Sequence, residues 1–128
     1  MVVKVVFGWR DHPDKTAQEC EDHYRSVHMK LAETAYDGVD GFVALVYDRV
    51  RRHLVNDHNQ PTPVEREPDM DAFCELYFQD DASMAEAFRR PQMQALFDDH
   101  VNFMDVESAA NIRLYNVDET VFLGRRPS

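Results

Sequence analysis

The sequence predicts an α+β fold, in which one four-stranded antiparallel sheet is covered on one face by two helices. Segments with strand-like and helix-like hydrophobic patterns follow one another in the order β-α-β-β-α-β. The first strand segment is apolar on both sides, which is typical of a central strand. With 128 residues, 44% of them hydrophobic, we expect one domain over residues 1–128 with ample core material.

The first half of the chain contains the first β-α-β unit. Residues 2–9 form a nearly continuous apolar run. Thr16 and Glu19 have the T-x-x-E spacing of a capping box, and small or apolar residues then recur every three or four positions over 17–35, which predicts an amphipathic helix. Residues 42–54 alternate like a strand and become basic at their end, as an edge strand would.

The second half completes the pattern after a long connection. Residues 55–70 contain prolines, asparagines and acids, and we expect them to be an irregular loop. Residues 72–78 are a strong strand, and the helix that follows is interrupted at Pro91 before a last strand over about 110–123. Two β-α-β halves joined in this way predict a ferredoxin-like sandwich with the strand order 4-1-3-2.

Composition and strand pattern restrict the partners. The formal net charge of −10 disfavours nucleic acid and anionic membranes, and no apolar run is long enough to span a bilayer. Cys20 and Cys74 lack C-x-x-C spacing and no signal peptide precedes them, so we expect a cytoplasmic protein. Because the first strand is apolar on both faces apart from Lys4, we expect the open sheet face to be buried in a homodimer.

Three segments resemble one known family in the order in which they occur. Residues 23–31 (HYRSVHMKL) resemble the aromatic-x-x-x-His-x-x-Leu signature of the EthD family. Residues 71–78 resemble its third strand, and residues 103–105 are similar to its closing turn. The resemblance implies a dimeric α/β barrel and a role in catabolic or polyketide pathways. Relatives that share this barrel include lactone isomerases, cyclases, dehydratases and cofactor-free oxygenases.

His28 is the first candidate for catalysis. Helical spacing places it beside Tyr24 and Leu31 near the buried stripe, where a partly desolvated imidazole can act as a general acid or base. It also occupies the signature position of the resemblance. The alternative is a core histidine with one hydrogen-bond partner. We expect its ring to border a dry hollow between the helices and the sheet.

Glu75 is the second candidate, because it lies within a strand and a carboxylate there needs a partner. It could orient the imidazole of His28 or protonate a substrate. Alternatively, it could form an ion pair with Lys4 or Arg113 from neighbouring strands. The catalytic version requires Glu75 and His28 to reach the same cavity.

Other aromatic and imidazole side chains could line a substrate pocket, and the hydroxyl of Tyr24 could hold an oxyanion. The alternative for each is a place in the core. The candidate lining residues are Trp9, Phe42, Tyr47, Tyr77 and His100.

A metal site is not expected. His23 and His28 are five positions apart, roughly 140° around an ordinary helix, so they do not form the i, i+4 pair of a zinc helix. No glycine-rich phosphate loop or dinucleotide fingerprint is present.

The leading hypothesis is a cofactor-independent lyase or isomerase, similar to a dehydratase or cyclase. It would act on a small carbonyl-bearing or aromatic metabolite with His28 as general acid and base. Two other classes stay open. One is a monooxygenase of the same barrel, either haem-binding or cofactor-free, and the other is a non-catalytic dimer that binds a metabolite.

Overall fold

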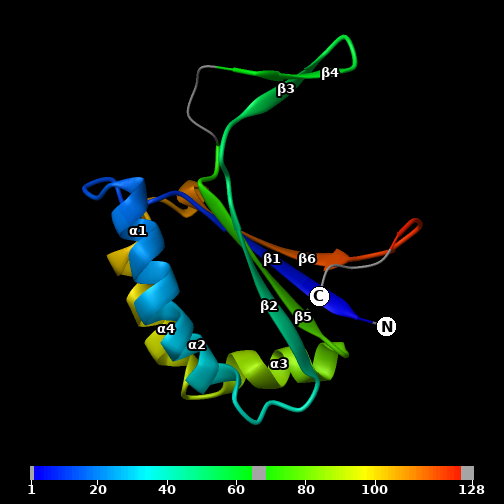
Figure 1. Cartoon of the computed structure of the whole chain (residues 1–128). Helices are drawn as coiled ribbons and strands as arrows, with labels where there is room; N and C mark the ends of the chain where they lie inside the picture. The colour runs from blue at the N-terminus through cyan, green and yellow to red at the C-terminus, as the bar shows by residue number, and fades with distance from the viewer. Residues whose placement is uncertain (1, 65–68, 125–128) are drawn as a thin grey trace.

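The computed structural model describes residues 2–64 and 69–124. In these residues four strands form one antiparallel sheet in the order β2-β5-β1-β6, which is the predicted order. Figure 1 shows the helices together on one face of this sheet, and the sheet is not closed. The elements are β1 Val3–Trp9, α1 Ala17–His23, the π turn Tyr24–His28, α2 Met29–Tyr36, β2 Phe42–Arg49, β3 Leu54–Asp57, β4 Gln60–Pro63, β5 Ala72–Phe78, α3 Asp81–Arg89, α4 Met93–Asp99, the 3-10 turns His100–Asn102 and Ala109–Asn111, and β6 Ile112–Asp118.

Local sequence signals set where the helices begin. The Thr16 hydroxyl accepts from the amide of Glu19, and the Glu19 carboxylate accepts from the amide of Thr16, so the predicted capping box is present. Asp80 caps α3 by accepting from the amide of Ser83. The predicted interruption at Pro91 separates α3 from α4.

The core lies between the sheet and the helices. Strand residues alternate between this core and the open face, so Cys74 and Leu76 are buried on the helix side while Glu75 lies between them on the other side. The largest side chains that are almost wholly buried are Trp9, Phe78, Phe103, Met93, Met104 and Cys20.

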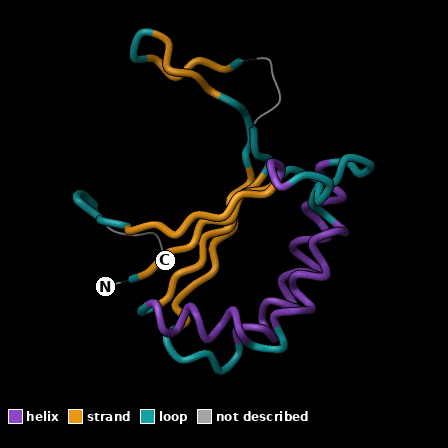
Figure 2. Tube along the Cα trace, turned by 180° about the vertical axis from the view of Figure 1, so that it is seen from behind, coloured by secondary structure: helices purple, strands orange, loops and turns teal. Residues whose placement is uncertain are grey.

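The prediction of an irregular loop over 55–70 was wrong for most of that segment. β3 and β4 form a hairpin that stands away from the sheet (Figure 2). His58 and Asn59 adopt φ values of 50° and 66°, which suit a tight hairpin turn. The prolines are tolerated because this isolated hairpin has free edges. Residues 65–68 lie outside the described part of the chain.

Of the helices in the described ranges, none combines the length and the apolar character needed to cross a membrane.

Candidate active site

A π turn brings together the two histidines of the first helical segment. The amide of Met29 donates to the carbonyl of Tyr24, five residues back, instead of four as in an α-helix. In such a turn, two residues that are five positions apart in the sequence lie about one helical turn apart. His23 and His28 therefore face the same side of the helical segment. The expected separation of roughly 140° was wrong because it assumed ordinary α-helical geometry.

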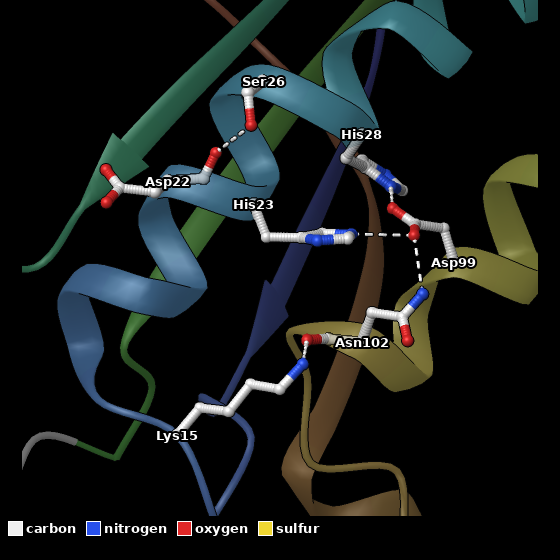
Figure 3. Close-up of polar contacts among 7 residues, drawn as sticks. All are labelled: Lys15, Asp22, His23, Ser26, His28, Asp99 and Asn102. Carbon is white, nitrogen blue, oxygen red and sulfur yellow. Dashed lines mark hydrogen bonds and ion pairs between the residues drawn. The ribbon is translucent and has the colours of Figure 1, made fainter.

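Both imidazoles contact one carboxylate, that of Asp99 at the end of α4 (Figure 3). His28 Nδ1 lies 2.8 Å from Asp99 Oδ2, and His23 Nε2 lies 2.8 Å from Asp99 Oδ1. The side-chain amide of Asn102 donates to Oδ1 at 2.9 Å. His28 and Asp99 are each only 6% exposed, so this is a buried hydrogen-bonded pair in which both carboxylate oxygens have partners.

The surroundings of this pair favour an ionised carboxylate and a neutral imidazole. Burial alone would raise the pKa of Asp99, but hydrogen bonds from Asn102, His23 and His28 outweigh it and lower that pKa. Burial lowers the pKa of His28 below its ordinary value, although Asp99 opposes the shift. With Nδ1–H donating to Asp99, the lone pair of the neutral ring is on Nε2. His28 can therefore accept a proton while Asp99 stabilises the resulting cation.

A small hollow of about 40 Å³ adjoins His28. It lies between β1 and β5 on one side and the helices on the other, and its wall includes Phe7, Trp9, Tyr24, His28, Cys74 and His100. A volume of this size holds one or two water-sized groups. The expected hollow is thus present, and His28 is buried beside it.

The hydroxyl of Tyr24 is the unusual polar group in this wall. It is fully buried, and no atom of the described residues meets it with hydrogen-bonding geometry. The thiol of Cys74 is one of the groups that interact with this hydroxyl, and burial raises the pKa of that thiol to about 12. Burial also raises the pKa of Tyr24, so the hydroxyl stays protonated and is available to donate to a bound oxygen.

The aromatic rings around Tyr24 fix its position. Its ring stacks on Tyr47 and on Trp9, with centroids 4.3 and 5.3 Å away. His28 stacks on the same ring, 5.3 Å from it, and His100 lies 5.4 Å from His28. Burial and the proximity of His28 lower the pKa of His100 to about 4, so His100 is neutral near pH 7.

Four candidates do not line the hollow. Tyr47 lies behind it, stacked on the ring of Tyr24. Glu75 and Tyr77 face the open side of the sheet, where Glu75 Oε1 lies 2.5 Å from Lys4 Nζ and Tyr77 Oη donates to Glu119. Pairing Glu75 with His28 was wrong because neighbouring residues of β5 point to opposite faces; the alternative ion pair with Lys4 is confirmed. Phe42 stacks on Tyr36 beyond the hollow, so it does not line the wall beside His28.

Sequence reasoning missed Asp99, Asn102 and His23 as members of the site. Asp99 lies one turn before Phe103, and the other buried positions of its helix are apolar. A charged residue at a buried position needs a polar partner, and this was the signal that could have identified Asp99. Nothing in the sequence marks the π turn that directs His23 toward it. In the described residues, no group of three or more His, Cys, Asp or Glu side chains has the arrangement of a metal site.

Comparison with known proteins shows the same fold in several solved structures. An EthD family protein from Bacillus halodurans aligns with a TM-score of 0.64 and 20% identity over 94% of this chain and 100% of that one. A dimeric ferredoxin-like protein of unknown function from Jannaschia aligns with a TM-score of 0.64 and 12% identity, covering 93% and 100%. SnoaB, a cofactor-independent oxygenase from Streptomyces nogalater, aligns with a TM-score of 0.58 and 15% identity, covering 95% and 98%.

No curated protein sequence matches the chain. The family comparison is more specific: the EthD domain matches residues 12–107, which include the π turn, Asp99 and Asn102. This match spans well over half of the sequence. The chain therefore belongs to the EthD family.

Proposed function

We propose that this protein is a cofactor-independent lyase or isomerase that moves a proton on a small, carbonyl-bearing or aromatic metabolite. The observation that carries the proposal is the pairing of two groups in one dry hollow. His28 offers a basic nitrogen oriented by Asp99, and Tyr24 offers a buried hydroxyl without a partner among the described residues. Abstraction of a proton next to a carbonyl needs these two functions.

The chemistry follows from their positions. Nε2 of His28 takes a proton from the carbon beside a carbonyl, and the electron pair of the broken C–H bond moves onto the carbonyl oxygen. The hydroxyl of Tyr24 donates to that oxyanion. Asp99 stabilises the imidazolium that forms. The same imidazole then returns the proton to another carbon, which gives isomerisation, or to a departing hydroxyl, which gives loss of water.

The environment supports a base that works near neutral pH. Because burial lowers the pKa of His28, the ring is neutral before it takes the proton. His100 is neutral as well, so it does not oppose the charge that develops on His28. Exclusion of water strengthens the hydrogen bonds to Asp99 and to the oxyanion.

A cofactor-independent oxygenation is the second candidate, and the shared fold of SnoaB supports it. It would begin with the same base: His28 takes the hydroxyl proton of a phenol, and the electron-rich phenolate then reduces O₂ and is itself oxidised. Oxygen uptake with 2-naphthol, measured with an oxygen electrode, separates this reaction from isomerisation. A Soret band in the purified protein would indicate a haem-binding variant instead.

Proton exchange in D₂O tests the leading proposal without knowledge of the natural substrate. We expect the protein to accelerate incorporation of deuterium beside the carbonyl of small neutral ketones such as 2-tetralone, followed by NMR. Replacing Glu75 by Gln is the matched control, because Glu75 is a carboxylate on the opposite face of the sheet. Tight binding of these ketones with no exchange above the buffer rate would contradict the proposal and indicate a non-catalytic binding protein.

We also propose that the open sheet face forms a homodimer, as the dimeric ferredoxin-like relatives suggest. Val6 lies at its centre, opposite Glu75 and Tyr115 on the neighbouring strands. Replacing Val6 by Glu would add an unpaired charge there and should convert dimer to monomer in sedimentation velocity. The control is Val101→Glu on the helix side, which is already 51% exposed and should leave the dimer intact.

A further inference from the structure

An apolar groove of about 370 Å³ lies between α2 and β2. Its walls include Met29, Ala32, Tyr36, Phe42 and Leu45. Tyr36 also lines the hollow beside His28. One side chain therefore borders both spaces.

The two spaces are complementary in size and chemistry. The hollow is lined by His28 and by Tyr24, whose hydroxyl has no hydrogen-bond partner in the part of the chain that the structure describes. At about 40 Å³ the hollow is too small for a whole metabolite. The groove falls within the size range of small-molecule sites, roughly 300–1,000 Å³, but it contains no imidazole. Neither space is a complete catalytic site alone.

Tyr36 is a buried side chain at the end of a helix. It is the last residue of α2, and the chain leaves the helix through Asp37 in an extended conformation and Gly38 at a φ of 74°. Helix ends fray more readily than helix centres. The ring of Tyr36 is held by stacking on Phe42, with centroids 4.6 Å apart, so a flat ligand can replace that contact with its own ring.

We propose that the groove and the hollow form one substrate site, joined when the ring of Tyr36 turns aside. This inference rests on the proposed function and specifies its substrate class: a flat, apolar and uncharged molecule with a carbonyl or phenolic oxygen at one end. The apolar body occupies the groove, and the oxygen reaches Tyr24 and His28. Glu33 and Asp37 line the same groove, so they disfavour carboxylate substrates.

Binding of 2-naphthol, followed by ¹H–¹⁵N NMR, tests the site directly. We expect it to shift the amides of Glu33 in the groove and of His28 in the hollow together. Met29→Trp fills the groove and should raise Kd by about tenfold or more. Lys30→Trp, the exposed neighbour on α2, should change Kd by less than about twofold. Equal affinity of the Met29 and Lys30 variants would overturn the proposal.

The acidic wall gives an independent test with 2-naphthoate, which has the same ring system and a carboxylate. The double variant Glu33→Gln, Asp37→Asn should bind 2-naphthoate about five- to tenfold more tightly and leave 2-naphthol unchanged. An unchanged preference for the naphthol would contradict the proposed substrate class.

These outcomes separate the substrate site from the proposed reaction. His28→Ala should abolish proton exchange while 2-naphthol binds within about threefold of the original Kd. If the groove variants have no effect on binding but His28→Ala still abolishes exchange, the groove proposal fails and the reaction stands. If naphthol binds as expected and no exchange occurs, the reaction fails and the binding site stands.

Discussion

The neighbouring residues Cys74 and Glu75 of strand β5 face opposite sides of the sheet, and the polar groups around them differ. Cys74 faces the helices and lines the hollow beside His28, whose ring is hydrogen-bonded to the buried carboxylate of Asp99. Glu75 faces the open side, where it forms an ion pair with Lys4, whose Nζ also lies 3.0 Å from Glu119. Tyrosines occur on both faces: the hydroxyl of Tyr24 has no partner in the described residues, whereas that of Tyr77 donates to Glu119.

This contrast shows which carboxylate can support acid–base chemistry. On the open face the ammonium group of Lys4 is shared between the carboxylates of Glu75 and Glu119, and all three side chains remain partly exposed. Asp99, in contrast, is buried and accepts a hydrogen bond from the imidazole of His28 beside the hollow. The two carboxylates therefore differ in their partners: Asp99 contacts the imidazole that lines the hollow, and Glu75 contacts Lys4.

The largest expected difference between the faces is in catalysis. Removing the base in His28→Ala should lower the rate of proton exchange by about 10²- to 10⁴-fold. Glu75→Gln should change it by less than about twofold, since the sheet separates this carboxylate from the hollow. Exchange rates from NMR in D₂O measure both. Comparable losses in the two variants would remove the distinction between the faces.

The tyrosines should differ in a second way. Tyr24→Phe should lower exchange by about 10²-fold, because it removes the donor to the oxyanion. It should leave stability unchanged or raise it by up to about 1 kcal/mol, because the lost hydroxyl is buried without a hydrogen bond among the described residues. Urea unfolding gives the stability. Tyr77→Phe is the control, and a Tyr24 variant that keeps full activity would exclude a role for its hydroxyl.

The two faces should also respond to pH with opposite signs. The folded-state pKa of His100, about 4, lies below its ordinary 6.5, so stability is present above pH 6.5 and is lost as the pH falls toward 4. The loss is up to about 3 kcal/mol, and His100→Phe should remove it. Thermal unfolding between pH 4 and pH 7 measures the effect. A variant with the same acid sensitivity as the original protein would show that another group is responsible.

The smallest effect is expected on the open face. Burial and the neighbouring Glu75 raise the pKa of Asp48 from 3.8 to about 6, so its ionisation costs stability as the pH rises through that range. Because Asp48 is exposed, screening reduces the gain expected from Asp48→Asn at pH 7 to a few tenths, roughly 0.3 kcal/mol. Urea unfolding at pH 4 and pH 7 should show the gain only at the higher pH. A gain at pH 4 would contradict the assignment.

The fold was predictable because its signals are local. The capping box at Thr16, the break at Pro91 and the alternating strands each depend on a few neighbouring residues, and together they fix the order of elements. The β3–β4 hairpin was missed because its prolines resemble loop residues, although they are compatible with strands that have free edges.

The site was only partly predictable, because it depends on long-range contacts. The burial of His28 followed from helical spacing, but its partner Asp99 is 71 residues away and is reached through a π turn. The face of Glu75 was left open between His28 and Lys4, since β1 is apolar on both sides apart from Lys4 and does not by itself show which side the helices cover. That choice required the packed structure.

The most direct measurement is a residue-resolved pH titration of the His28 ring by ¹⁵N NMR, compared with the pH profile of proton exchange. We predict an Nδ1–H tautomer and a midpoint below 6.5, with exchange rising through that same midpoint as the pH increases. A His28 midpoint at or above 6.5, or an exchange profile that follows a different group, would contradict the assignment of His28 as the base.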